Sequence, residues 1–137
     1  LADPSAEEAL LPLCQREGIA VTPYSPLAAG FLTGKYSRDP STWPKGSRYH
    51  IMPAHADVYF SDRNFQTLER LGEKGVELGI PSVRLAMAWA MTHPAITSVL
   101  IGARHSGHID NALEAFHMGL TDDLRSEMSA WTTGAIV

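Results

Sequence analysis

The sequence predicts an α/β fold in which parallel strands are covered by helices. Residues 19–24 form a short apolar run, and residues 96–101 form a second run that is β-branched and continuous rather than alternating. A continuous apolar run is typical of a strand that is buried on both faces, as in parallel sheets. Helix patterns precede, separate and follow the two runs, which predicts βα organisation with right-handed crossovers.

The first helix is expected between Ser5 and Gly18. Ser5 and Glu8 have the spacing of a capping box, and Gly18 suits a helix C-terminus. Pro12 lies inside this stretch and predicts a kink or a late start, because proline lacks the N–H that a helix needs.

Residues 25–61, after the first predicted strand, are rich in glycine, proline, serine and charge. A loop of this length in a compact domain is usually functional or disordered. Trp43 lies in it and is expected either to contact a substrate or to be an exposed loop aromatic.

The remaining helices follow from cap signals and apolar spacing. Asp62 can cap a helix that ends near Gly79, and Pro81 can start another that ends before the second strand. Two further helices are expected near residues 106–115 and, capped by Thr121, near residues 122–131.

Composition restricts the protein to ordinary globular classes. The 137 residues suffice for one modest domain, and 45% hydrophobic with 19% charged residues is a typical globular composition. With 11 basic and 15 acidic residues the net charge is −4, so no general nucleic-acid or anionic-membrane surface is expected. The single cysteine, Cys14, excludes an intrachain disulfide framework and favours a cytoplasmic location.

Two features bear on targeting. The chain starts at Leu1 without an initiator methionine and without the pattern of a secretory signal, which suggests a processed product or part of a gene. Residues 85–103 contain no Asp, Glu, Lys or Arg and are long enough to cross a membrane, but Pro94 interrupts them. A buried helix followed by a buried strand explains this stretch better.

Residues 24–35, Tyr-Ser-Pro-Leu-Ala-Ala-Gly-Phe-Leu-Thr-Gly-Lys, form the first candidate for chemistry. They are not a P-loop, because Ala29 replaces the first glycine and Tyr36 replaces the magnesium-binding hydroxyl residue. Even so, Gly30 permits close approach of the backbone and Lys35 supplies a cation for a phosphate. The alternative is a strand-end tyrosine in a core, followed by a tight loop with a solvated lysine.

Residues 101–104, Ile-Gly-Ala-Arg, form the second candidate. Gly102 is expected to allow a sharp turn after the strand, and the next helix offers free N–H groups and the positive end of its dipole. Arg104 adds a planar guanidinium suited to phosphate. The alternative is a surface arginine at a helix start. Together the two candidates predict a groove for a phosphate-bearing cofactor.

In this order the two segments resemble the aldo-keto reductases, in particular the branch near the potassium-channel β subunits. Residues 46–48, Gly-Ser-Arg, also resemble a contact of that family on the adenosine side. The resemblance covers essentially the whole chain. It implies that residues 1–137 are the C-terminal half of an aldo-keto reductase domain, the C-terminal portion of a (β/α)8 TIM barrel that this chain leaves incomplete.

The resemblance also implies a site for NADP(H). Tyr24 would stack on the nicotinamide, the segment up to Lys35 would line the pyrophosphate, and Arg48 and Arg104 would face the 2′-phosphate. The residues expected to bind the cofactor are Tyr24, Ser25, Pro26, Leu27, Ala29, Gly30, Lys35, Arg48, Gly102, Arg104, His108 and Asn111.

This sequence departs from the family pattern in the helix after Arg104. His108 stands at the usual Gln, Asn111 at the usual Glu and Ala112 at the usual Asn. Asn111 can still reach an adenine edge, whereas Ala112 cannot. No residue of this chain matches the catalytic Asp, Tyr, Lys and His of the family, so no catalytic residue is expected here, and no metal site is expected either.

The resemblance implies that the complete protein reduces aldehydes or ketones by hydride transfer from NADPH, with this chain as its cofactor-binding part. The alternatives are a non-catalytic, NADPH-sensing interaction module and a gene remnant with neither property. The expected partners are a small carbonyl substrate and either the missing N-terminal half or an oligomeric partner, with no nucleic acid and no membrane.

Overall fold

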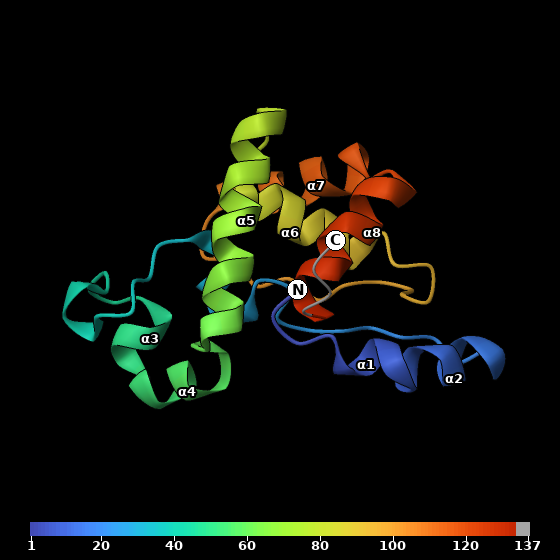
Figure 1. Ribbon diagram of the computed structural model, residues 1–137, viewed down its shortest axis with the longest axis horizontal. Helices are drawn as coiled ribbons and strands as arrows, with labels where there is room; N and C mark the ends of the chain where they lie inside the picture. Colours follow the sequence, from blue (N-terminus) through green and yellow to red (C-terminus); the bar gives the residue numbers. More distant parts are fainter. Residues whose placement is uncertain (134–137) are drawn as a thin grey trace.

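The structure is a computed structural model that describes residues 1–133, and helices dominate it (Figure 1). The α-helices are α1 (Ser5–Glu8), α2 (Leu10–Arg16), α3 (Arg48–Ile51), α4 (Ala56–Tyr59), α5 (Asp62–Leu78), α6 (Ser82–Met91), α7 (Ser106–Met118) and α8 (Asp122–Thr133). Short 3-10 helices are η1 (Ala28–Thr33), η2 (Pro40–Thr42) and η3 (Pro53–His55).

The predicted parallel strands are wrong: residues 1–133 contain no β-strand. The α/β class, and with it the incomplete TIM barrel that the resemblance implied, is therefore not seen in the described part of the chain. Residues 19–24 and 96–101 have no regular secondary structure and are not covered on both faces, since Ile19 is 54% exposed and Leu100 is 59% exposed.

The hydrogen bonds between these two segments explain why no strand forms. The N–H groups of Thr97 and Leu100 donate to the carbonyl oxygens of Val21 and Pro23, each at 2.9 Å. The return bonds of a ladder are missing, because Pro23 has no N–H and the Val21 N–H donates to the Thr97 hydroxyl at 3.1 Å. The segments lie side by side without forming a sheet.

Helix α5 begins and ends as the cap signals require, with one correction. Ser61, rather than Asp62, is the N-cap, and its hydroxyl accepts the N–H of Asn64 at 3.2 Å. Gly79 ends the helix in the left-handed conformation that favours glycine. At α8 the Thr121 hydroxyl accepts the N–H of Leu124 at 3.3 Å, which confirms the predicted cap.

The predicted first helix is broken into α1 and α2 at Ala9. Pro12 accounts for the break, because it cannot donate to the carbonyl of Glu8 and its ring crowds that carbonyl. The capping box is wrong: no side chain caps α1, and the N–H of Ser5 instead donates to the Asp3 carboxylate at 3.0 Å.

The long loop of residues 25–61 is a folded lobe with its own aromatic core, which extends to the left of α5 in Figure 1. Tyr36, Trp43, Tyr49 and Phe60 pack mostly edge to face, with ring centroids 4.6–6.3 Å apart. Trp43 is only 7% exposed, and its Nε1 donates to the Ser37 carbonyl at 2.9 Å. Both expectations for Trp43 are therefore wrong.

Helix α6 crosses behind α5 and packs against α7 (Figure 1). Leu85, Ala86, Met87 and Ala88 are consecutive and all buried, as expected for a helix with neighbours on every side. A small cluster of Met87 and Ala88 with alanines of α7 joins the two helices. The close pairing of α6 and α7 fixes one wall of the site described below.

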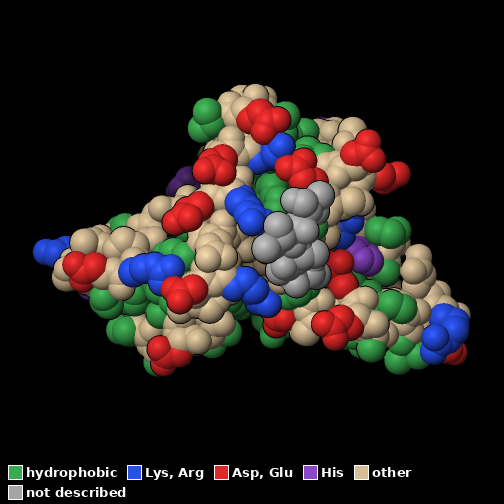
Figure 2. Space-filling view, in the orientation of Figure 1, with side chains coloured by type: hydrophobic (Ala, Val, Ile, Leu, Met, Phe, Trp, Pro, Cys, Tyr) green, Lys and Arg blue, Asp and Glu red, His purple; other side chains and the backbone are tan. Residues whose placement is uncertain are grey.

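Acidic and basic side chains intermingle over α5 and α8 on the face that Figure 2 shows. Lys74 of α5 illustrates the pairing, because its ammonium lies 2.8 Å from Glu77 and 2.9 Å from Glu127 of α8. Within residues 1–133 no helix is long and apolar enough to span a membrane.

Candidate functional site

An unusual backbone shapes the segment after Tyr24. Ser25, Ala28 and Ala29 have positive φ angles of 56°, 49° and 54°, and Gly30 follows at 94°. Non-glycine residues adopt this left-handed conformation at a cost, and such strain clusters at functional sites. Hydrogen bonds hold the turns closed, among them the bond from the Thr33 hydroxyl to the Gly30 carbonyl at 2.7 Å.

The aromatic core of the lobe is tied to this strained segment. The hydroxyl of Tyr49 is buried and donates to the carbonyl of Ala28 at 2.7 Å. Burial, and to a lesser extent the nearby Tyr59 and Tyr36, raises the pKa of Tyr49 well above its usual range. Tyr49 therefore stays protonated and serves as a fixed donor.

The strained segment (residues 25–35), Arg48, α6 and the start of α7 line a half-open cavity of about 860 Å³, here called the main cavity. Its lining residues are Ser25, Pro26, Leu27, Ala29, Gly30, Thr33, Lys35, Arg48, Val83, Met87, Gly102, Ala103, Arg104, His105, His108 and Asn111. The volume is that of a small-molecule or cofactor pocket.

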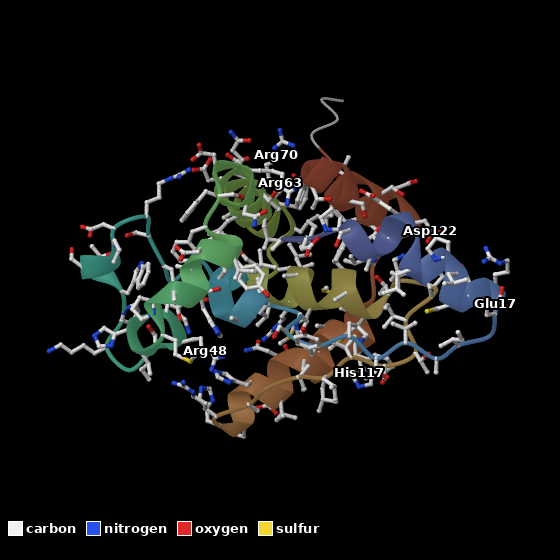
Figure 3. All side chains as sticks on the ribbon, turned by 90° about the horizontal axis from the view of Figure 1, so that it is seen from below. Glu17, Arg48, Arg63, Arg70, His117 and Asp122 are labelled. Carbon is white, nitrogen blue, oxygen red and sulfur yellow. The ribbon has the colours of Figure 1, made fainter. Side chains whose placement is uncertain are left out.

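Three cations face the main cavity, and no Asp or Glu is among its lining residues. Lys35 comes from the strained segment, Arg48 from α3 and Arg104 from the residues before α7. Figure 3 shows Arg48 on the side of the lobe that faces α7. A guanidinium nitrogen of Arg104 donates to the Gly46 carbonyl at 3.2 Å and so links the lobe to the start of α7. The site is suited to an anion.

A pair of histidines stands beside these cations at the start of α7. The rings of His105 and His108 are 3.9 Å apart between centroids, and Nδ1 of His108 accepts the backbone N–H of Arg104 at 3.3 Å. Desolvation, followed by the charges of His105, Lys35 and Arg104, lowers the pKa of His108. No side chain caps α7, so its first N–H groups add to the positive character of this end.

A polar network lies on the α6–α7 side of the main cavity. Nε of Arg84 donates to the side-chain oxygen of Asn111 at 2.9 Å, and the same guanidinium forms an ion pair with Glu114. Asn111 lines the main cavity, whereas Arg84 and Glu114 do not.

The structure brings all the expected cofactor residues except Tyr24 to the main cavity. Tyr24 is 79% exposed and lines a second cavity of about 510 Å³, which shares Ser25 and Pro26 with the first. Gly102 lies in the main cavity but lacks the positive φ that a sharp left-handed turn would give.

Sequence reasoning missed several lining residues: Thr33, Val83, Met87, Ala103 and His105. Val83 and Met87 are one helical turn apart on α6, so their shared face was visible in the sequence. The neighbour that this face meets depends on tertiary packing. His105 carried a signal too, as one turn of helix separates it from His108.

The side chains able to transfer a proton among the residues that line the main cavity are Lys35, His105 and His108, and no Asp, Glu or Tyr is among them. Lys74 lies outside this lining and is paired with glutamates of α5 and α8. Residues 1–133 also contain no group of three His, Cys, Asp or Glu side chains that could hold a metal ion. The lining side chains of the main cavity therefore suit an anion.

Comparison with known proteins gives a family match. The profile of the Aldo/keto reductase family matches residues 1–131. A probable voltage-gated potassium channel subunit beta of Arabidopsis thaliana is 33% identical over 111 residues, which are 80% of this chain and 33% of the relative. The NADH-specific methylglyoxal reductase of Escherichia coli (strain K12) is 32% identical over 128 residues, 89% of this chain and 36% of the relative. The chain thus spans about a third of the length of these relatives.

A solved structure is similar as well. The glycerol dehydrogenase AKR11B4 from Gluconobacter oxydans matches with a TM-score of 0.69 and 23% identity, over 96% of this chain and 39% of that chain. At this identity the likeness shows a shared fold.

Proposed function

Because this chain belongs to the aldo/keto reductase family, as its two motifs predicted, we propose that its main cavity binds NADP(H). In the complete protein the bound cofactor serves the reduction of an aldehyde or ketone. The family is one of oxidoreductases, and relatives of this chain include a methylglyoxal reductase and an L-glyceraldehyde 3-phosphate reductase.

One observation carries the proposal: Lys35, Arg48 and Arg104 come from three separate parts of the chain and meet at one cavity without an acidic residue. NADP(H) carries negative charge on its pyrophosphate and on its 2′-phosphate, so the residues present fit this group. The strained segment with Gly30 and Lys35 would hold the pyrophosphate, because its backbone allows close approach. Arg48 and Arg104 would hold the 2′-phosphate.

The nicotinamide would lie toward the second cavity. That cavity shares Ser25 and Pro26 with the main one, and Tyr24 lines it with its ring exposed. An exposed ring beside the end of a phosphate site is placed to stack on a flat heterocycle. Tyr24 would therefore act at the junction of the cavities.

The reduced cofactor supplies a hydride to the carbonyl carbon of the substrate. A proton must also reach the carbonyl oxygen, and no tyrosine is among the residues that line the main cavity to supply it. The hydroxyl of Tyr49 already donates to Ala28, and burial raises its pKa. The proton donor would come from another part of the complete protein, so the isolated chain should bind cofactor without turnover.

A second candidate is a module that binds NADP(H) without catalysis and responds to it. It is favoured by the absence of Asp, Glu and Tyr among the residues that line the main cavity, together with the likeness to a probable potassium channel subunit beta. Turnover by the completed protein separates the two, since a sensing module would bind NADPH but reduce no carbonyl compound. The predicted carbonyl substrate, the partner and the cytoplasmic location stay predictions.

Calorimetric titration of the chain with NADPH and NADH tests the proposal. NADPH should bind more tightly than NADH, and Lys35→Gln should weaken both about tenfold, as expected for one charge-assisted contact. Arg48→Gln and Arg104→Gln should weaken the binding of NADPH more than the binding of NADH. Arg70→Gln, at an exposed position on α5, is the matched control and should change neither.

Three outcomes would count against the proposal. Failure of the chain to bind NADPH would overturn the cofactor site. Equal affinity for NADH would overturn the assignment of the 2′-phosphate, an informative comparison because one relative is an NADH-specific reductase. Oxidation of NADPH by an aldehyde with the chain alone would overturn the absence of catalysis.

A further inference from the structure

The contact between Arg84 and Asn111 determines which side-chain atoms of Asn111 a ligand in the main cavity could contact. Arg84 rises from α6 and its Nε lies 2.9 Å from the side-chain oxygen of Asn111 on α7. The other side of the guanidinium is held by Glu114, one turn further along α7. With its side chain only 33% exposed and engaged on both sides, Arg84 is a rigid partner.

The chemistry of the pair leaves one orientation for the amide. A guanidinium has donors and no acceptor, so the atom of Asn111 that faces it must be the carbonyl oxygen. The amide nitrogen, with two hydrogens, then remains for the main cavity that Asn111 lines. Arg84 thus occupies the side-chain oxygen of Asn111, its acceptor, and leaves the amide nitrogen as a donor.

The surroundings of Asn111 suit the flat base of a nucleotide. Val83 and Met87 of α6 line the same cavity and offer an apolar surface. Arg104 and the histidine pair lie toward the start of α7, and they would hold phosphate nearer the helix start. A base that lies on the apolar surface would present an edge to the Asn111 amide.

We propose that Arg84 is a positioning residue that makes Asn111 a pure hydrogen-bond donor, so that the cavity does not select the 6-amino group of adenine. This inference rests on the proposed NADP(H) site. Adenine offers its amino group as a donor and N7 as an acceptor, whereas a 6-oxo purine offers acceptors at both positions. Because the lining residues include no carboxylate, a donor-only amide should accept hypoxanthine in place of adenine.

The test compares NADPH with its reduced hypoxanthine analogue by calorimetry. The measured quantity is the ratio of the dissociation constant of the analogue to that of NADPH. For the unaltered chain the ratio should be at or below about 1, the value for two ligands bound with equal free energy. For Asn111→Asp, whose carboxylate accepts from the amino group, it should rise about tenfold, because the analogue would meet an unpaired acceptor.

Variants of Arg84 separate positioning from a structural role. Arg84→Met frees the amide to turn its oxygen toward the amino group, so the ratio should rise about threefold to tenfold. Arg84→Lys keeps a donor and should keep the original ratio. Glu114→Gln leaves the contact between Arg84 and Asn111 and is the matched control.

The possible failures can be told apart. If neither ligand binds the unaltered chain, the proposed cofactor site and this inference both fail. If NADPH binds at least about tenfold more tightly than the analogue, the cavity contains an acceptor and only this inference fails. An unchanged ratio in Arg84→Met would also overturn the inference. If Arg84→Met does not fold, the ratio measured for Asn111→Asp decides whether the inference holds.

Discussion

The Tyr49 hydroxyl lies 2.7 Å from the carbonyl oxygen of Ala28 and joins the aromatic core of the lobe to the strained wall of the main cavity. Both residues are buried, so water cannot replace this bond. Ala28 itself has a φ of 49°, a conformation that its surroundings must maintain. The lobe therefore acts as a support for the proposed cofactor site.

Tyr49→Phe should reduce the free energy of unfolding by about 1–3 kcal/mol, because the buried Ala28 carbonyl would lose its donor. Urea unfolding followed by circular dichroism measures this change. Tyr36→Phe is the matched control in the same aromatic core: the Tyr36 hydroxyl is buried without a partner, so its removal should be neutral or stabilising. Equal losses in the two variants would contradict the role given to the bond.

Two glycines of α5 should respond to alanine in opposite directions. A Cβ on Gly75 would lie 2.8 Å from the Ile80 carbonyl oxygen and 3.2 Å from the Ser82 hydroxyl, whereas one on Gly72 would meet nothing within 4 Å. Gly75→Ala should therefore lower the free energy of unfolding by about 1–3 kcal/mol, because the added methyl group would overpack this contact. Gly72→Ala should stabilise the chain by about 0.5–1 kcal/mol through helix propensity. Thermal unfolding measures both, and a stabilising Gly75→Ala would contradict the close approach of α5 to the start of α6.

Gly30→Ala should lower the free energy of unfolding by about 1–2 kcal/mol, because the φ of 94° at Gly30 strains any residue with a Cβ. Space is not the cause, since the nearest atoms, at the end of Lys35, would be 3.7 Å away. NADPH affinity should fall with stability if this turn holds the pyrophosphate. Ala29→Gly is the contrasting variant: relief of strain and added chain entropy should nearly cancel, within about 0.5 kcal/mol. Chemical denaturation and calorimetry are the measurements.

His93 should make the chain less stable as the pH falls below about 6.5, the usual pKa of histidine. Desolvation and the charge of Arg125 lower the pKa of His93 in the folded state, while Glu7 opposes them. The unfolded chain therefore binds the proton first, and stability present at neutral pH is lost on acidification. Protonation of Nδ1 would also break its bond to the Ala95 N–H, now at 3.0 Å. Between pH 8 and pH 5 the midpoint of urea unfolding should fall less steeply with pH for His93→Gln than for the unaltered chain. Identical slopes for the two proteins would exclude this role of His93.

Local signals predicted the helices well. The Thr121 cap and the left-handed Gly79 depend on neighbours a few residues away, so sequence spacing was enough to place them. The same holds for the break at Ala9, which follows from the missing N–H of Pro12. The cationic character of the site was predictable too, because Lys35 and Arg104 stand in recognisable motifs.

Properties that require a distant partner could not be predicted. Apolar, β-branched residues favour a strand, but a strand exists only if its backbone groups are paired, and Pro23 interrupts the pairing of residues 19–24. Trp43 is buried because other aromatic side chains of the lobe close around it. Tyr24 lies outside the main cavity because the chain turns at Ser25, whose φ is positive.

The sequence by itself determined the family, the helices and the kinds of side chain that could hold an anion. Only the tertiary structure decided which side chains meet: Val83 and Met87 of α6 with Arg104 at one cavity, and Arg84 with Asn111 across α6 and α7. The physical reason is the range of the interactions. Caps and turns act within a few residues, whereas a cavity and a hydrogen bond between helices depend on how separate segments pack.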